Sequence, residues 1–137
     1  MNKKREMKEQ CYLEALENGV VSVEMIINRL RQIKDKEGIF DKHILDHDYM
    51  ETILDLELSL ASLCILLRKM SENVFIMISD DLRIDMNSII HSNRFEYCDG
   101  EIVVYSQKGR EEVDLDHLLS FCHSILSNDK VCNTAHL

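Results

Sequence analysis

Apolar residues recur at alternating steps of four and three positions through the first quarter of the chain. This spacing predicts a long amphipathic helix over residues 3–36. Gly19 lies inside the stripe, so a helix that tolerates the glycine at a cost of about 1 kcal/mol competes with two helices, the second capped by Ser22. The stripe keeps its phase across Gly19, which favours one helix ending at Glu37-Gly38. Its members are Leu16, Val20, Val23, Ile27 and Leu30.

The segment 41–72 carries aliphatic side chains around most of a helical circumference, which is typical of the central helix of a bundle. Glu57 is an exception to the pattern because it falls on the apolar side, near Cys64. A carboxylate in such a place needs a partner. We expect an arginine or histidine of another helix, and the alternative is a supporting role beside His91. The outward polar stripe consists of Glu51, Asp55, Ser59 and Ser62.

The rest of the chain predicts a third helix over residues 74–92, a β-hairpin and a last helix. Asp99-Gly100 lies between β-forming segments 94–97 and 102–105, which is a strong hairpin signal. Residues 107–112 are predicted to form a polar loop, Asp114 to cap the last helix, and residues 127–137 to form a frayed, flexible tail. The third helix buries a stripe of Phe75, Ile78, Leu82, Met86 and Ile89.

These elements predict an all-α fold, an up-and-down helical bundle of about four main helices with a small β-hairpin inserted between the last two. A chain of 137 residues is long enough for one domain with a substantial core, and we expect a single domain over 1–137.

A polar stripe on the third helix holds the best candidates for chemistry. Arg83, Asn87 and His91 follow one another at four-residue steps, so they share a face opposite the apolar stripe. An imidazole titrates near neutral pH and can act as acid or base. A guanidinium stabilises the negative charge that builds on a phosphate, and an amide can orient that phosphate. Capping of the helix end by His91 is the purely structural alternative.

The region 80–125 resembles the motif region of HEPN domains, which are small helical bundles that often act as ribonucleases. Their motif is an arginine, a polar residue, a few residues and a histidine, often followed by a short hairpin and an Asp-Leu-x-x-Leu helix. The resemblance implies a metal-independent endoribonuclease of toxin or defence type. It rests on Asn87-Ser88-Ile89-Ile90-His91, Ser92-Asn93-Arg94-Phe95, Asp99-Gly100, Ile102-Val103-Val104-Tyr105 and Val113-Asp114-Leu115-Asp116-His117-Leu118-Leu119.

The resemblance also implies partners. HEPN active sites form where two motif helices face each other, so we expect a homodimer with His91 at or near a two-fold interface. An RNA substrate or ligand follows from the family, and an antitoxin or other protein partner follows from the toxin type.

The chain departs from the motif at one position, because Met86 stands where the family has its arginine. We therefore expect at most a weak ribonuclease, in which Met86→Arg raises activity. Arg83 and Arg94 are the arginines nearest in sequence that could replace the missing one. The departure also favours a second function, a non-catalytic dimeric binding module. A small acidic inhibitor or adaptor protein is the third.

Composition narrows these choices only slightly. The formal net charge of −9 argues against broad binding to nucleic acid, but it leaves room for a local basic site. Five widely spaced cysteines without a CxxC pair are typical of a reduced, cytoplasmic protein, and no membrane segment is expected. His43 and His47 have a spacing that suits metal ligands, but no third ligand is nearby, so we expect no metal and no cofactor.

Overall fold

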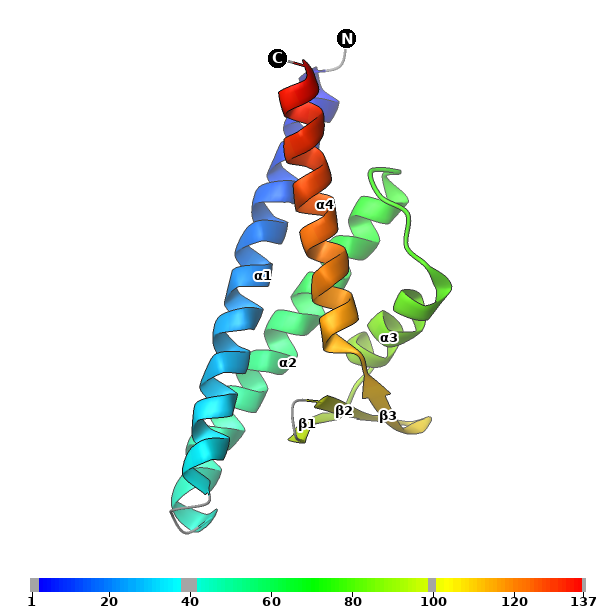
Figure 1. Cartoon of the computed structure of the whole chain (residues 1–137). Helices are drawn as coiled ribbons and strands as arrows, with labels where there is room; N and C mark the ends of the chain where they lie inside the picture. Colours follow the sequence, from blue (N-terminus) through cyan, green and yellow to red (C-terminus); the bar gives the residue numbers. More distant parts are fainter. Residues whose placement is uncertain (1–2, 38–41, 99–100, 137) are drawn as a thin grey trace.

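The computed structural model describes the backbone of residues 3–37, 42–98 and 101–136, and the side chains of residues 3–33, 47–97 and 101–128. This part of the chain contains four helices and three strands (Figure 1). The helices are α1 (Lys3–Glu37), α2 (Lys42–Glu72), α3 (Asp80–Ile90) and α4 (Leu115–His136). The strands are β1 (Arg94–Cys98), β2 (Glu101–Ser106) and β3 (Gly109–Val113). None of the described helices combines the length and apolar character needed to cross a membrane.

Helices α1 and α2 form a long antiparallel pair, and α4 runs beside α1 (Figure 1). The prediction of one helix through Gly19 is confirmed, and the glycine has a packing reason. A Cβ atom at position 19 would lie 3.2 Å from Cδ1 of Leu63, so the missing side chain lets α2 approach α1 closely. The predicted α1 stripe is buried throughout: Leu16, Val20, Val23, Ile27 and Leu30.

The third helix is shorter than predicted, because α3 begins at Asp80 rather than near residue 74. Ser79 is the N-cap, and its hydroxyl accepts a hydrogen bond from the N–H of Leu82. The chain turns at Val74, whose φ of 63° lies in a region that β-branched residues rarely adopt. Phe75 then packs edge-on against the ring of Tyr12, so this connecting segment is held against α1. Phe75 and Ile78 mimic the helical stripe because both pack against the core, whereas Met77 between them is exposed.

The predicted hairpin is one part of a three-stranded antiparallel sheet in the order β1-β2-β3. Its two strands are confirmed, and the expected Asp99-Gly100 turn lies outside the described residues. The predicted polar loop 107–112 is wrong, because strand β3 begins at Gly109, whose φ of 115° suits glycine. The charged residues of β3 hid this strand, since an edge strand needs few apolar side chains.

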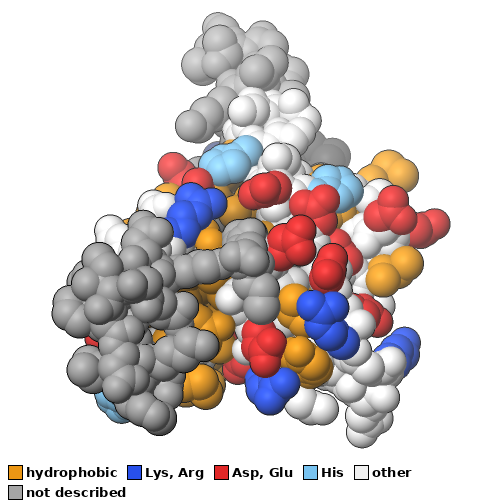
Figure 2. Space-filling view, turned by 60° about the horizontal axis from the view of Figure 1, so that its bottom comes forward, with side chains coloured by type: hydrophobic (Ala, Val, Ile, Leu, Met, Phe, Trp, Pro, Cys, Tyr) orange, Lys and Arg blue, Asp and Glu red, His pale blue; other side chains and the backbone are white. Residues whose placement is uncertain are grey.

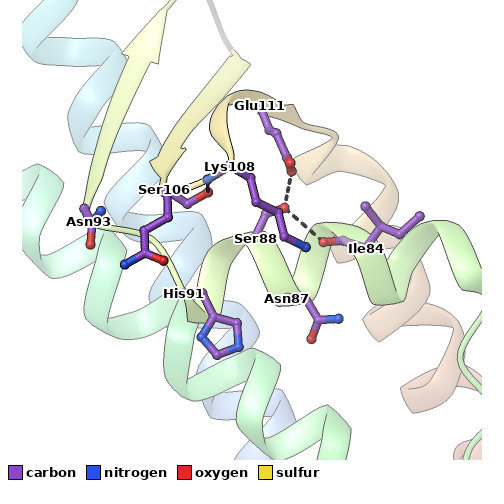
Figure 3. A pocket seen from close by; sticks show the side chains of 9 residues that line it. Ile84, Asn87, Ser88, His91, Asn93, Ser106, Lys108 and Glu111 are labelled. Atoms are coloured by element: carbon purple, nitrogen blue, oxygen red, sulfur yellow. Dashed lines mark hydrogen bonds between the residues drawn. The ribbon is translucent and has the colours of Figure 1, made fainter.

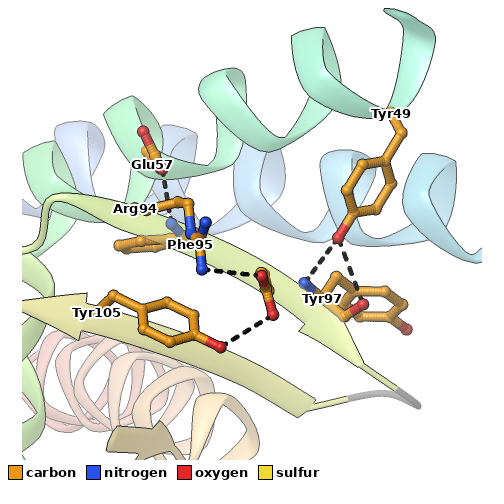
Figure 4. A network of polar contacts seen from close by, with 7 residues as sticks. Tyr49, Glu57, Arg94, Phe95, Tyr97 and Tyr105 are labelled. Atoms are coloured by element: carbon orange, nitrogen blue, oxygen red, sulfur yellow. Dashed lines mark hydrogen bonds and ion pairs between the residues drawn. The ribbon is translucent and has the colours of Figure 1, made fainter. Parts of the chain in front are cut away.

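Strand β1 forms one edge of the sheet, and two side chains of α2 bind this edge (Figure 4). The N–H of Phe95 donates to Oε1 of Glu57 over 2.8 Å, and the N–H of Tyr97 donates to the hydroxyl of Tyr49 over 2.9 Å. The predicted partner of Glu57, an arginine or histidine of another helix, is therefore wrong. The carboxylate instead satisfies a backbone donor that β1, as an edge strand, would leave unpaired.

The start of α4 agrees with prediction, because Oδ1 of Asp114 accepts a hydrogen bond from the N–H of His117 over 3.0 Å. The helix then continues to His136, through most of the segment predicted to be a frayed tail.

Removal of the Glu57 carboxylate should destabilise the fold. We expect Glu57→Ala to lower the free energy of unfolding by about 1–3 kcal/mol, because it leaves the N–H of Phe95 without its charged acceptor. Urea denaturation measures the change. The control is Asp55→Ala on the exposed side of the same helix, for which we expect less than about 0.5 kcal/mol. Equal effects of the two variants would contradict this role of Glu57 at the sheet edge.

Candidate functional site

The outer face of α3 separates two surface pockets, and Asn87 lines both of them. The first pocket, of about 400 Å³, lies between α3 and the turn that joins β2 to β3 (Figure 3). Asn87 and His91 line it from α3, and Lys108 lines it from the β2–β3 turn, in a distant part of the chain. The others are Ile84, Ser88, Asn93, Ser106, Gln107 and Glu111.

The second pocket, of about 340 Å³, lies between α3 and the end of α2. Nη2 of Arg68, on α2, donates a hydrogen bond to Oδ1 of Asn87 over 2.7 Å. Arg83 lines the same pocket, so two arginines and one amide border a single cavity. The remaining lining residues are Ser71, Glu72, Ile78 and Met86. Such an arrangement suits a phosphate, because guanidinium groups bind its oxygens and an amide can orient them.

His91 occupies the C-cap of α3, with φ −97° and ψ 14°, and its N–H donates to the carbonyl of Asn87 over 3.0 Å. The structural alternative raised by the sequence is therefore present. The imidazole is nevertheless exposed and lines the first pocket. The cap fixes the backbone of His91 at the end of α3, and its imidazole ring stays on the surface that lines the first pocket together with Asn87.

The two arginines proposed from the sequence have different surroundings. Arg83 lines the second pocket with Asn87, and its Nε donates to the carbonyl of Ile78 over 3.4 Å. Arg94 instead lies 4.4 Å above the ring of Tyr105 and pairs with Glu96 over 3.2 Å (Figure 4). Arg94 therefore belongs to the open face of the sheet and lines neither pocket.

Met86 is a core residue, only 3% exposed. It also lines the second pocket, whose charged residues are Arg68, Arg83 and Glu72. Sequence reasoning missed Arg68 because the residue lies on another helix, 19 positions before Asn87. Its place directly after the apolar run 60–67 was the only local signal.

The sheet end of the molecule is acidic (Figure 2). Burial raises the pKa of Asp85, and the neighbouring carboxylates of Asp114 and Glu111 raise that pKa further, against the lowering effects of the backbone at Asp114 and of His117. Asp85, Asp114 and Glu111 thus gather three carboxyl groups on this flank of α3, which makes it less favourable for an anionic ligand than the side with Arg68 and Arg83.

The described residues give little support to a buried cysteine nucleophile or to a metal site. Burial raises the pKa of the Cys64 and Cys122 thiols to about 12, so neither is a nucleophile at neutral pH. No group of three or more His, Cys, Asp and Glu suited to a metal ion occurs in the described part of the chain. His47 pairs with Glu51, and the side chain of His43 lies outside the described residues.

No family model, curated protein or solved structure matches this chain. The function is therefore inferred from the geometry around Asn87.

An arginine at position 86 should destabilise the fold. We expect Met86→Arg to lower the free energy of unfolding by about 2 kcal/mol or more, because the longer side chain displaces core atoms and adds a third cation beside Arg68 and Arg83. The control is Met77→Arg, at a side chain that is 90% exposed, for which we expect a change within about 0.5 kcal/mol. Thermal and urea unfolding compare the two. Equal stability would show that position 86 has room for the arginine of the motif.

Proposed function

We propose that this chain is a HEPN-like protein of toxin or defence type that binds RNA across the outer face of α3. We further propose that it is at most a weak, metal-independent endoribonuclease. The observation that carries the proposal is the contact between Arg68 and Asn87. It brings a guanidinium from α2 to the polar stripe of α3, although Met86 occupies the motif position that the resemblance assigns to arginine.

The proposed chemistry assigns a role to each residue of the stripe. A backbone phosphate lies over Asn87, between the guanidinium groups of Arg68 and Arg83, which stabilise the charge that builds during cleavage. His91, one helical turn further on, exchanges a proton with the attacking 2′-hydroxyl or the leaving 5′-oxygen. Attack of the 2′-oxygen on phosphorus breaks the bond to the 5′-oxygen and leaves a cyclic phosphate, so the reaction consumes no metal or cofactor.

A second copy of the chain would complete this site, because one imidazole cannot serve at once as base and as acid. The side of α2 that carries Arg68 also carries exposed apolar side chains, including Leu54, Leu58 and Ile65, which are 52%, 70% and 43% exposed. Exposed apolar side chains gathered on one helix face are typical of a protein interface. A two-fold pairing over this face would cover them and bring two copies of the α3 stripe together.

The alternative is a dimeric module that binds RNA, or a protein partner such as an antitoxin, without cleavage. Two observations favour it: the motif arginine is replaced by the buried Met86, and the sheet end presents an acidic surface that could contact a basic partner (Figure 2).

Cleavage of RNA in the presence of a metal chelator tests the enzymatic proposal. We expect slow cleavage by the unmodified chain, none by His91→Ala, and a loss of about 10²–10³ in rate for Arg68→Ala, because a donor to the developing charge is removed. The matched control is Arg31→Ala, an exposed arginine of α1 far along the sequence from the stripe, which should cleave at the unmodified rate. Salt-sensitive RNA binding without any turnover would reject the enzyme and select the binding module.

The proposed dimer predicts a specific sensitivity on α2. We expect a dimer at micromolar concentration that Leu58→Glu converts to a monomer, because two carboxylates would then face an apolar surface. Met7→Glu is the control and should leave the dimer intact, since Met7 is 69% exposed but lies near the start of α1. Sedimentation velocity distinguishes the states. A monomeric unmodified chain, or a dimer that Leu58→Glu leaves intact, would contradict the proposal.

A further inference from the structure

The pocket between α3 and the β2–β3 turn differs in chemistry from the cationic pocket on the other side of Asn87. Its side chains include one ammonium, one carboxylate and three amides, so it offers both hydrogen-bond donors and acceptors. Glu111 offsets the charge of Lys108 in this pocket, whereas the second pocket has two arginines against Glu72, so a phosphate is less favoured here. The volume of about 400 Å³ lies within the range of about 300–1,000 Å³ found for small-molecule sites.

The Glu111 carboxylate is held in place at one wall of this pocket. Glu111 lies on β3, and its Oε2 is bound by the hydroxyl of Ser88 on α3 (Figure 3). The same hydroxyl lies 3.1 Å from the carbonyl of Ile84, so the helix backbone positions the serine as well. On the neighbouring side, the side chain of Lys108 reaches from the turn toward α3 (Figure 3). A fixed acceptor and a nearby cationic donor therefore line one pocket.

We infer that this pocket binds the base of the nucleotide whose phosphate lies between Arg68 and Arg83, and that Glu111 makes it selective for guanine. The inference rests on the proposed RNA binding and adds its sequence preference. Asn87 lines both pockets, so a phosphate and its neighbouring base can be held on either side of one residue. Proteins that read single-stranded RNA hydrogen-bond its splayed bases along their edges in this way.

Guanine matches the pocket because its N1–H and N2–H₂ donors lie side by side, and a carboxylate accepts at both oxygens. Lys108 can donate to O6 and N7 of the same base. Ile84, whose side chain is 58% exposed, supplies an apolar surface for the ring. Uracil offers a single N–H between two carbonyl oxygens, which the carboxylate repels. Adenine and cytosine each place one amino group beside an acceptor nitrogen.

Binding of short single-stranded RNAs tests this selectivity. Each RNA carries one central guanine, adenine, cytosine or uracil flanked by uracil, and fluorescence anisotropy at low salt gives its Kd. We expect the guanine RNA to bind about tenfold more tightly than the others, and Glu111→Gln to remove most of that preference. The amide oxygen that this substitution introduces can still accept from Ser88, so the fold should persist, and thermal unfolding checks this.

Two control variants separate base selection from affinity. Glu112→Gln changes the neighbouring strand residue, which pairs with Arg110 and does not line the pocket, and it should keep the guanine preference. Arg68→Ala should weaken binding of all four RNAs alike. Lys108→Ala, at an exposed turn residue, is a second pocket variant and should also reduce the preference.

The outcomes distinguish this inference from the function on which it rests. RNAs that bind without guanine preference, or a guanine preference that Glu111→Gln leaves intact, would overturn the base pocket and leave the proposed function intact. Absence of binding to any of the four RNAs would overturn the proposed function together with the pocket.

Discussion

The edge of the β-sheet is held by α2, and the geometry of the candidate site depends on that attachment. An isolated small sheet has little stability of its own. Glu57 and Tyr49 satisfy alternate N–H groups of β1, so the sheet joins the helical pair through hydrogen bonds as well as through buried side chains. Because β2 and β3 follow from β1 by register, the same contacts place the β2–β3 turn beside the end of α3. The wall of the first pocket that the sheet supplies is positioned in this way.

Periodicity was sufficient to predict the helices that have one long apolar stripe. The stripe through Gly19 gave α1 as a single helix, and the Asp114 cap gave the start of α4. The start of α3 could not be predicted in the same way, since Phe75 and Ile78 pack against the core from the irregular segment before α3 and copy the spacing of a helix. Strand β3 was missed for the opposite reason. Its side chains are mostly charged, and its strand character comes from pairing with β2.

In the candidate site, too, residues close together in the sequence could be predicted, and residues from other elements could not. Arg83, Asn87 and His91 could be grouped from spacing alone, and the structure brings Asn87 together with each of the other two, in separate pockets. Arg68, Lys108 and Glu111 could not be found in this way because their places depend on how α2 and the sheet pack against α3. The sequence also suggested Arg94, which its position on the open sheet face removes from the site. Residues that follow one helix are thus predictable, and residues that complete a pocket across elements are not.

The central claim is that an RNA phosphate lies beside Arg68, and the salt dependence of binding tests it most directly. Each phosphate contact to a single strand contributes about 0.7 to the slope of log Kd against log salt concentration. We predict that Arg68→Ala weakens binding and lowers this slope by about 0.7, while Arg31→Ala leaves both unchanged. An Arg68→Ala variant with the affinity and slope of the unmodified chain would contradict the claim.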